Sequence, residues 1–147
     1  EYAREYLATK YNELVLGGFL IEVEIPEMII WCQIDVQQMK RVFDNIISNS
    51  LRHNPPGTVI YVTLQQSDKA VRIEIGDSGV GIPLELQDTL FDPFIVGDES
   101  RNTRQGSGLG LAVAHKIIEL HGGALFLEKG EQHGNGISTL FVIRLLK

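Results

Sequence analysis

Residues 36–53 read VQQMKRVFDNIISNSLRH, and the spacing of their side chains decides most of the fold. Apolar positions recur every three or four residues, which predicts an amphipathic helix with one face in the core. The repeating positions are Val36, Met39, Val42/Phe43, Ile46/Ile47 and Ser50/Leu51. The following Pro55-Pro56-Gly57 ends this helix, because proline cannot continue the helical hydrogen-bond ladder.

The opposite face of this helix carries polar groups that suit a nucleotide. At about 100° per residue, Asn45, Asn49 and Arg52 fall within about 60° of one another. An asparagine carbonyl oxygen is a neutral, hard ligand for Mg²⁺, and arginine can engage phosphate oxygens as a fork. The alternative is a polar outer face without a role.

The rest of the chain alternates helical and strand patterns. Helical spacing is predicted for 2–15 and 109–120. Alternating apolar residues predict strands at 19–25, 28–34, 60–64, 71–75, 125–127 and 137–145. Ser67-Asp68-Lys69 is a candidate hairpin turn. This order predicts an α+β fold, a two-layer α/β sandwich in which three helices cover one face of a mixed sheet.

Length and composition indicate one globular domain, residues 1–147. The net charge of −6 argues against a nucleic-acid partner, because that backbone is an anion. No apolar run reaches the ~18 residues of a membrane span, so no membrane contact by this chain is expected. Cys32 is the single cysteine, and its apolar neighbours favour a buried, unreactive thiol.

Two glycine-rich stretches add candidate ligand groups. In Asp77-Ser78-Gly79-Val80-Gly81, a carboxylate at a strand end precedes two glycines that let the backbone approach a planar ligand. An ionised aspartate can accept a hydrogen bond from an exocyclic amine such as adenine N6. An ordinary turn with an acidic residue is the alternative.

The second stretch, Gly106-Ser107-Gly108-Leu109-Gly110, opens a predicted helix. Main-chain amides at a helix N-terminus form a natural seat for phosphate. A Rossmann site is not indicated, since no βαβ unit surrounds the glycines, and a Walker A site is not indicated, since no Gly-Lys-Ser/Thr follows. About 15 residues without clear periodicity precede it, and loops of that length are usually functional.

Taken together, these stretches resemble the four motifs of the histidine kinase, gyrase, Hsp90 and MutL ATPase superfamily. The segment 45–53 resembles its N box, 77–81 its G1 box, Phe91-Asp-Pro-Phe94 its F box, and 106–111 its G2 box. The match covers about residues 36–145. The F box and the form of the N box are similar to those of sensor histidine kinases, whose catalytic domain adopts the Bergerat ATP-binding fold.

The resemblance implies a role for each matching residue on the helix and strands. Asn49 would coordinate Mg²⁺ with Asn45 assisting, and Arg52 would contact phosphate. Asp77 would bind adenine N6, with Gly79 and Gly81 providing room. Two further residues would lie near the adenine: Thr139, and His53, which stands where the family often has Tyr.

The resemblance also implies an ATP lid at about 92–108, anchored by Phe91 and Phe94. Arg101 and Arg104 would be its catalytic cations for the γ-phosphate, because phosphoryl transfer depends on charge stabilisation. A solubilising role for these arginines is the alternative. The phosphate cradle and lid hinge would be Gly106, Ser107, Gly108, Leu109 and Gly110.

The implied activity is ATP- and Mg²⁺-dependent phosphotransfer to a histidine in a two-component system. None of the four histidines is followed by an acidic residue, as the family's acceptor is. The acceptor is therefore expected on a separate dimerisation domain absent from this chain. That domain and a response regulator would be the partners, and the parent is expected to be a membrane-bound bacterial receptor with this chain on its cytoplasmic side.

Two other functions stay open. One is an ATPase of the gyrase, Hsp90 or MutL type, which uses a Glu one helical turn before the metal Asn; that position is Asn45 here. The other is a non-catalytic module that binds nucleotide for regulation, against which the intact Asn49 and Asp77 argue.

Overall fold

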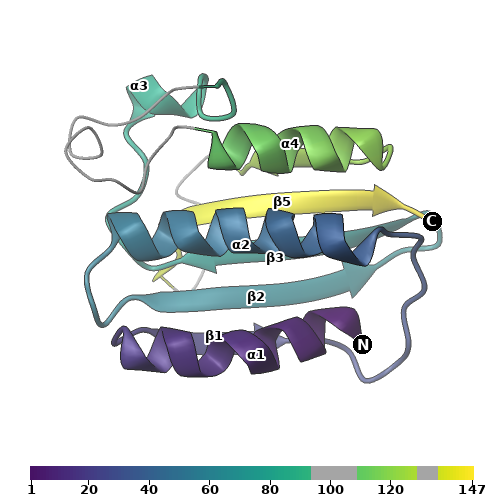
Figure 1. The fold of residues 1–147 in the computed structure, drawn as a ribbon, viewed down its shortest axis with the longest axis horizontal. Helices are drawn as coiled ribbons and strands as arrows, with labels where there is room; N and C mark the ends of the chain where they lie inside the picture. Colours follow the sequence, from purple (N-terminus) through teal and green to yellow (C-terminus); the bar gives the residue numbers. More distant parts are fainter. Residues whose placement is uncertain (94–108, 129–135) are drawn as a thin grey trace.

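The computed structural model describes residues 1–93, 109–128 and 136–147, which form two layers, a five-stranded sheet and a layer of helices over one of its faces (Figure 1). The strands lie in the order β1-β2-β3-β5-β4. Their bounds are Leu20–Glu24 (β1), Val59–Gln66 (β2), Ala70–Asp77 (β3), Ala124–Leu127 (β4) and Thr139–Leu146 (β5). The mixed sheet and its helical layer confirm the predicted α+β class and sandwich architecture.

Strand β1 pairs with β2 in parallel, and the other neighbouring pairs are antiparallel. The β2–β3 hairpin turns where the sequence predicts, with Ser67 N donating to Ala70 O at 2.9 Å. This register sets Asp77, the last residue of β3, opposite Ile60 on one side and Thr139 on the other. The sheet therefore brings the predicted adenine residues together at one end.

Three long helices pack on the sheet as predicted, and a four-residue helix lies outside this prediction. The bounds are Tyr2–Leu16 (α1), Val36–His53 (α2), Leu84–Gln87 (α3) and Gly110–Leu120 (α4). Helix α2 begins at an N-cap, Asp35, whose carboxylate accepts from Gln38 N at 3.0 Å. Within the described ranges, no helix has both the length and the apolar character needed to cross a membrane.

The apolar stripe predicted on α2 is the centre of the core. Val42 and Ile46 are fully buried on the helix, and Ile60 and Ile143 are fully buried on the sheet beneath it. Helix α2 lies between α1 and α4 in the helical layer (Figure 1). Because one face of α2 is buried in the core, only residues on its opposite face remain available to a ligand.

The strand predicted at residues 28–34 is wrong, because the structure has no strand there. The alternation that suggested it is real: Ile30, Cys32 and Ile34 pack against the core, while Ile29 and Trp31 are exposed. Strand assignment also needs a hydrogen-bonded neighbour, and this segment has no ladder partner in the described sheet. Cys32 is half-buried and not fully buried as predicted, and burial raises the pKa of its thiol.

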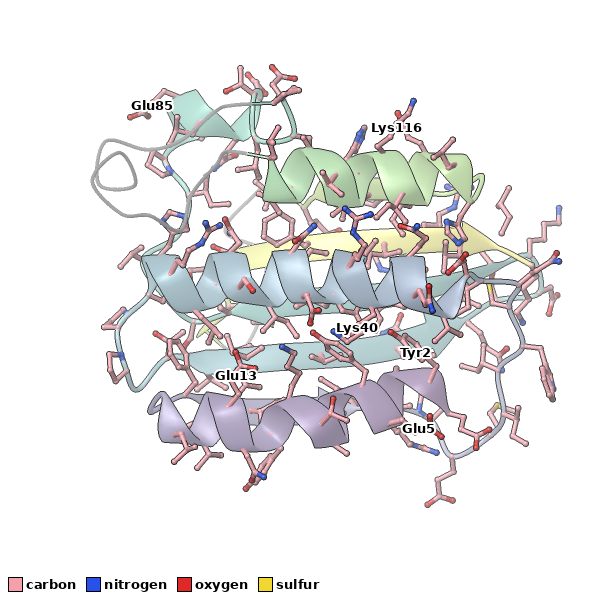
Figure 2. The ribbon with its side chains drawn as sticks, viewed as in Figure 1. Tyr2, Glu5, Glu13, Lys40, Glu85 and Lys116 are labelled. Atoms are coloured by element: carbon pink, nitrogen blue, oxygen red, sulfur yellow. The ribbon has the colours of Figure 1, made fainter. Side chains whose placement is uncertain are left out.

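A polar cluster fastens α1 to α2 around Asp44 (Figure 2 shows Lys40 between these helices). The Tyr6 hydroxyl donates to Asp44 at 2.6 Å, and Lys40 and Lys10 approach the same carboxylate at 2.8 and 3.2 Å. Burial by itself would raise the pKa of Asp44, but the hydrogen bonds from Lys40, Tyr6 and Lys10 outweigh it and lower that pKa. Asp44 thus holds α1 and α2 together, a structural role that the sequence did not reveal.

Candidate nucleotide site

Four elements converge at one end of the molecule, the left-hand end in Figure 1: the C-terminal part of α2, the end of β3, the start of β5 and the start of α4. The polar residues singled out in the sequence lie on these elements. Their convergence follows from the topology, since α2 and β3 both end here while β5 and α4 both begin here.

Asp77 is a buried polar residue of this end, with 2% of its surface exposed, and Ser50 is equally buried. Its Oδ2 accepts from the Ser50 hydroxyl at 2.8 Å, and its Oδ1 accepts from Gly79 N at 3.0 Å. An ionised carboxylate offers about four lone-pair sites, so these two bonds leave acceptor capacity on both oxygens. The Ser50 hydroxyl and the Gly79 amide are both neutral, so these two hydrogen bonds orient the buried carboxylate without pairing it with a cation.

Hydrogen bonds from other parts of the chain fix the turn that follows β3. Ser138 donates from its hydroxyl to Gly79 O at 2.7 Å and from its main-chain amide to Asp77 O at 2.8 Å. Val80 N donates to the Asn54 Oδ1 at 2.9 Å. Gly81 has φ +77°, a left-handed conformation that favours glycine. The turn is therefore shaped before any ligand arrives.

Gly79 and Gly81 are glycine for different physical reasons. A Cβ built on Gly79 would collide with the side-chain amide of Asn54. A Cβ on Gly81 would meet only Ser138 atoms, at 3.8 Å and beyond, so its glycine is required by φ. In this structure the space beside Gly79 is thus filled by a protein side chain.

The residues predicted on the polar face of α2 differ in how far they are buried. Asn45 and Asn49 are half-buried, whereas Arg52 and His53 are exposed at the end of the helix. A Cβ built on Gly110, the first residue of α4, would lie 3.8 Å from the Asn45 side chain. The structure therefore brings the N box and the last glycine of the G2 box together, with Leu109 half-buried at the N-cap of α4.

Thr139 opens β5 directly opposite Asp77 and is 5% exposed. A Cβ at Gly76 would come within 2.9 Å of the Thr139 carbonyl oxygen, so the two strands are closely apposed. The two residues expected to lie near adenine are therefore neighbours across this strand pair.

Phe91 of the F box packs on α4 and β5. Its ring stacks on His115 with centroids 5.0 Å apart and meets Phe141 edge-on at 6.2 Å. Several predicted residues lie outside the described residues, and the structure does not test them: Phe94, Arg101, Arg104, Gly106, Ser107 and Gly108.

Three residues that contact Asp77 or its turn escaped the sequence analysis: Ser50, Asn54 and Ser138. Ser50 carried a usable signal, because it is a polar residue on the apolar stripe of α2 and must therefore find a buried partner. Asn54 and Ser138 carried none, since their partners lie 26 and 59 residues away in the sequence.

The donor set fits Mg²⁺ bound together with phosphates. No group of three His, Cys, Asp or Glu side chains that could hold a metal exists among residues the structure describes. A half-buried amide such as Asn49 supplies one neutral oxygen, and Mg²⁺ commonly takes few protein ligands alongside phosphate oxygens and waters.

Comparison with known proteins gives a consistent result. Residues 34–147 match the family described as histidine kinase-, DNA gyrase B-, and HSP90-like ATPase. The sensor protein GtcS of Aneurinibacillus migulanus is 37% identical over 108 residues, which cover 74% of this chain and 29% of GtcS. The sensor histidine kinase WalK of Bacillus subtilis is 32% identical, over 94% of this chain and 24% of WalK. The chain therefore spans less than a third of the length of either relative.

Among solved structures, the nucleotide-free catalytic domain of histidine kinase ThkA superposes with a TM-score of 0.82 at 25% identity, covering 99% of this chain and 90% of that one. A structure of ThkA in complex with the response regulator protein TrrA matches at a TM-score of 0.78 and 24% identity, over 99% of this chain and 39% of that one. These likenesses extend over the whole sandwich described above.

Proposed function

Because this chain belongs to the family of histidine kinase-, DNA gyrase B- and HSP90-like ATPases, and is the ATP-binding catalytic domain of a sensor histidine kinase, we propose that it binds Mg-ATP and transfers the γ-phosphate to a histidine on a separate dimerisation domain. One observation carries the nucleotide part of this proposal. Asp77 is a buried carboxylate, oriented by neutral donors, that retains acceptor capacity at the end of β3.

Asp77 selects the base in this proposal. Its free lone pairs accept a hydrogen bond from the adenine N6 amine, and burial strengthens that bond because water does not compete. Thr139 lies beside it across the strand pair. A base that presents a carbonyl oxygen in place of the amine would face a buried anion and be rejected.

In this proposal the phosphates extend from the adenine beside Asp77 toward α2 and α4. Asn49 supplies the protein oxygen for Mg²⁺, with Asn45 beside the start of α4 at Gly110. When bound, Mg²⁺ neutralises phosphate charge and orients the chain of oxygens. Arg52 and the amides at the N-terminus of α4 add positive potential toward the same phosphates, and Arg101 and Arg104 are proposed for the γ-phosphate.

Phosphotransfer is favoured over hydrolysis by the side chain at residue 45. A water-activating ATPase needs a carboxylate general base there, and Asn45 has no basic site. The acceptor histidine belongs to the dimerisation domain of the same kinase, and a response regulator is the proposed next partner. The complex of ThkA with its response regulator TrrA supports that choice.

The test combines binding with phosphotransfer. Calorimetric titration of Mg-ATP into this chain should give saturable binding. Addition of a separately purified dimerisation domain and γ-labelled ATP should give an acid-labile phosphate on that domain, and the label should be absent when its acceptor histidine is replaced. Steady release of inorganic phosphate without labelling would favour the ATPase alternative. Binding without either reaction would favour the regulatory module.

A further inference from the structure

Asn54 joins the end of α2 to the turn after β3. It is the C-cap of α2, with an extended backbone at φ −125° and ψ 148°, as expected before Pro55. Its Nδ2 donates to Ser50 O at 2.9 Å, and its Oδ1 accepts from Val80 N at 2.9 Å. Both halves of one amide are thereby used, one on the helix and one on the turn.

Ser50 links this amide to Asp77. Its main-chain oxygen lies in the last turn of α2, where carbonyl groups lack helical partners, and Asn54 satisfies it. Its hydroxyl donates to Asp77 at 2.8 Å. The helix thus reaches β3 through two adjacent connections, one to the carboxylate and one to the turn that follows it.

Gly79 lies between these connections. Its N–H donates to Asp77 Oδ1, and its carbonyl accepts from Ser138, so the residue is held from two sides. A Cβ at this position would overlap the Asn54 amide, and the three atoms nearest to it all belong to that amide. Gly79 is not among the glycines with positive φ, so its backbone conformation does not itself require glycine.

We propose that Asn54 is a positioning residue for the nucleotide site, which fixes the 77–81 turn against α2, and that residue 79 is glycine because the Asn54 amide occupies the place of a side chain. The second half differs from the role expected from the motif, in which the glycine makes room for nucleotide. The first half rests on the proposed function, since the turn orients the carboxylate that would read the base.

A double-mutant cycle on the nucleotide-free chain tests the steric half. Gly79→Ala should lower the thermal midpoint by about 5 °C, the size expected for overpacking in a domain of this length. In the Asn54→Ala background the same substitution should lower it by less than half as much, because the obstructing amide is gone. A glycine reserved for nucleotide would show no effect without nucleotide.

Gly81→Ala is the matched control within the same turn. It forces an alanine to φ +77°, a strain that does not involve Asn54, so the loss in thermal midpoint should be equal in both backgrounds. Equal losses for Gly79→Ala in the two backgrounds, or no loss at all, would overturn the steric assignment.

The positioning half is tested by base selectivity. Inosine triphosphate lacks the exocyclic amine, so the affinity ratio of ATP to inosine triphosphate reports how well Asp77 is oriented. Asn54→Ala should weaken ATP about tenfold and narrow that ratio, while Asn54→Asp, which keeps the acceptor for Val80 N, should fall between. A loss equal for both nucleotides would show that Asn54 is merely structural. Absence of ATP binding by the unmodified chain would instead contradict the proposed function, and the thermal cycle would still stand as a test.

Discussion

Asp44, on helix α2, and Asp77, which α2 contacts through Ser50, are satisfied in opposite ways. Asp44 faces α1, keeps 27% of its side chain exposed, and is surrounded by Lys10, Lys40 and the Tyr6 hydroxyl. Asp77 lies at the end of β3, is 2% exposed, and accepts from a hydroxyl and a main-chain amide. Within the described part of the chain, Asp77 has no ion pair.

We propose that this difference separates a carboxylate that holds two helices together from a carboxylate that binds a ligand. A carboxylate whose charge is neutralised by cations of the same fold can hold two helices together. A buried carboxylate that is oriented only by neutral donors retains charge and lone pairs, a costly state that a ligand can relieve. In this proposal the hydrogen-bond and ion-pair partners of an acidic residue, more than its burial alone, distinguish one that serves a ligand.

Exchanging each carboxylate for its amide gives the largest expected contrast. Asp77→Asn should weaken Mg-ATP by more than about 100-fold, because an amide nitrogen would face the adenine amine, while the fold stays intact. Asp44→Asn should leave the affinity within about twofold. Calorimetry measures both, with circular dichroism to check folding. Unchanged affinity in Asp77→Asn would remove the basis for the adenine assignment.

Removing the hydroxyl donor at each carboxylate should have a smaller effect. Ser50→Ala leaves Asp77 short of one buried hydrogen bond, so Mg-ATP should bind about tenfold more weakly. Tyr6→Phe removes the matching donor from Asp44 and should lower the free energy of unfolding by about 1 kcal/mol without changing affinity. Urea titration and calorimetry on both variants separate the two outcomes. A loss of affinity in Tyr6→Phe would show that the hydrogen bonds around Asp44 are coupled to the site at Asp77.

The smallest expected effect is a dependence on pH. The pKa of Asp44 is lower in the folded chain than its ordinary value of about 3.9, so its stabilisation is present above that value and is lost as the pH falls through the folded pKa. The difference in unfolding free energy between the unmodified chain and Asp44→Asn should be largest near pH 7 and should shrink below about pH 4. Urea titrations across this range measure it, and a difference that grows toward acid would contradict the sign.

Local patterns were enough to predict several parts of this molecule. The spacing on 36–53 predicted α2 and the buried stripe that centres the core. The two alternating runs at 60–64 and 71–75, with Ser67-Asp68-Lys69 between them, predicted the hairpin. The motif residue Asp77 was predicted at a strand end, and Thr139 was predicted within the closing strand. Residues 28–34 show the limit of such patterns, because alternation records which side chains face the core and says nothing about whether a neighbouring strand exists to pair with.

What the sequence by itself determined is the chemistry at this end of the sheet: a helix with Asn45 and Asn49 on one face, and an aspartate followed by glycines at a strand end. Only the tertiary structure decided which groups hold that chemistry in place. Ser50, Asn54 and Ser138 acquire their roles from partners 26 to 61 residues away, and contacts across such separations are created by packing, which no local periodicity encodes. The same packing lets Asp44 join α2 to α1 and places Gly79 against the side-chain amide of Asn54.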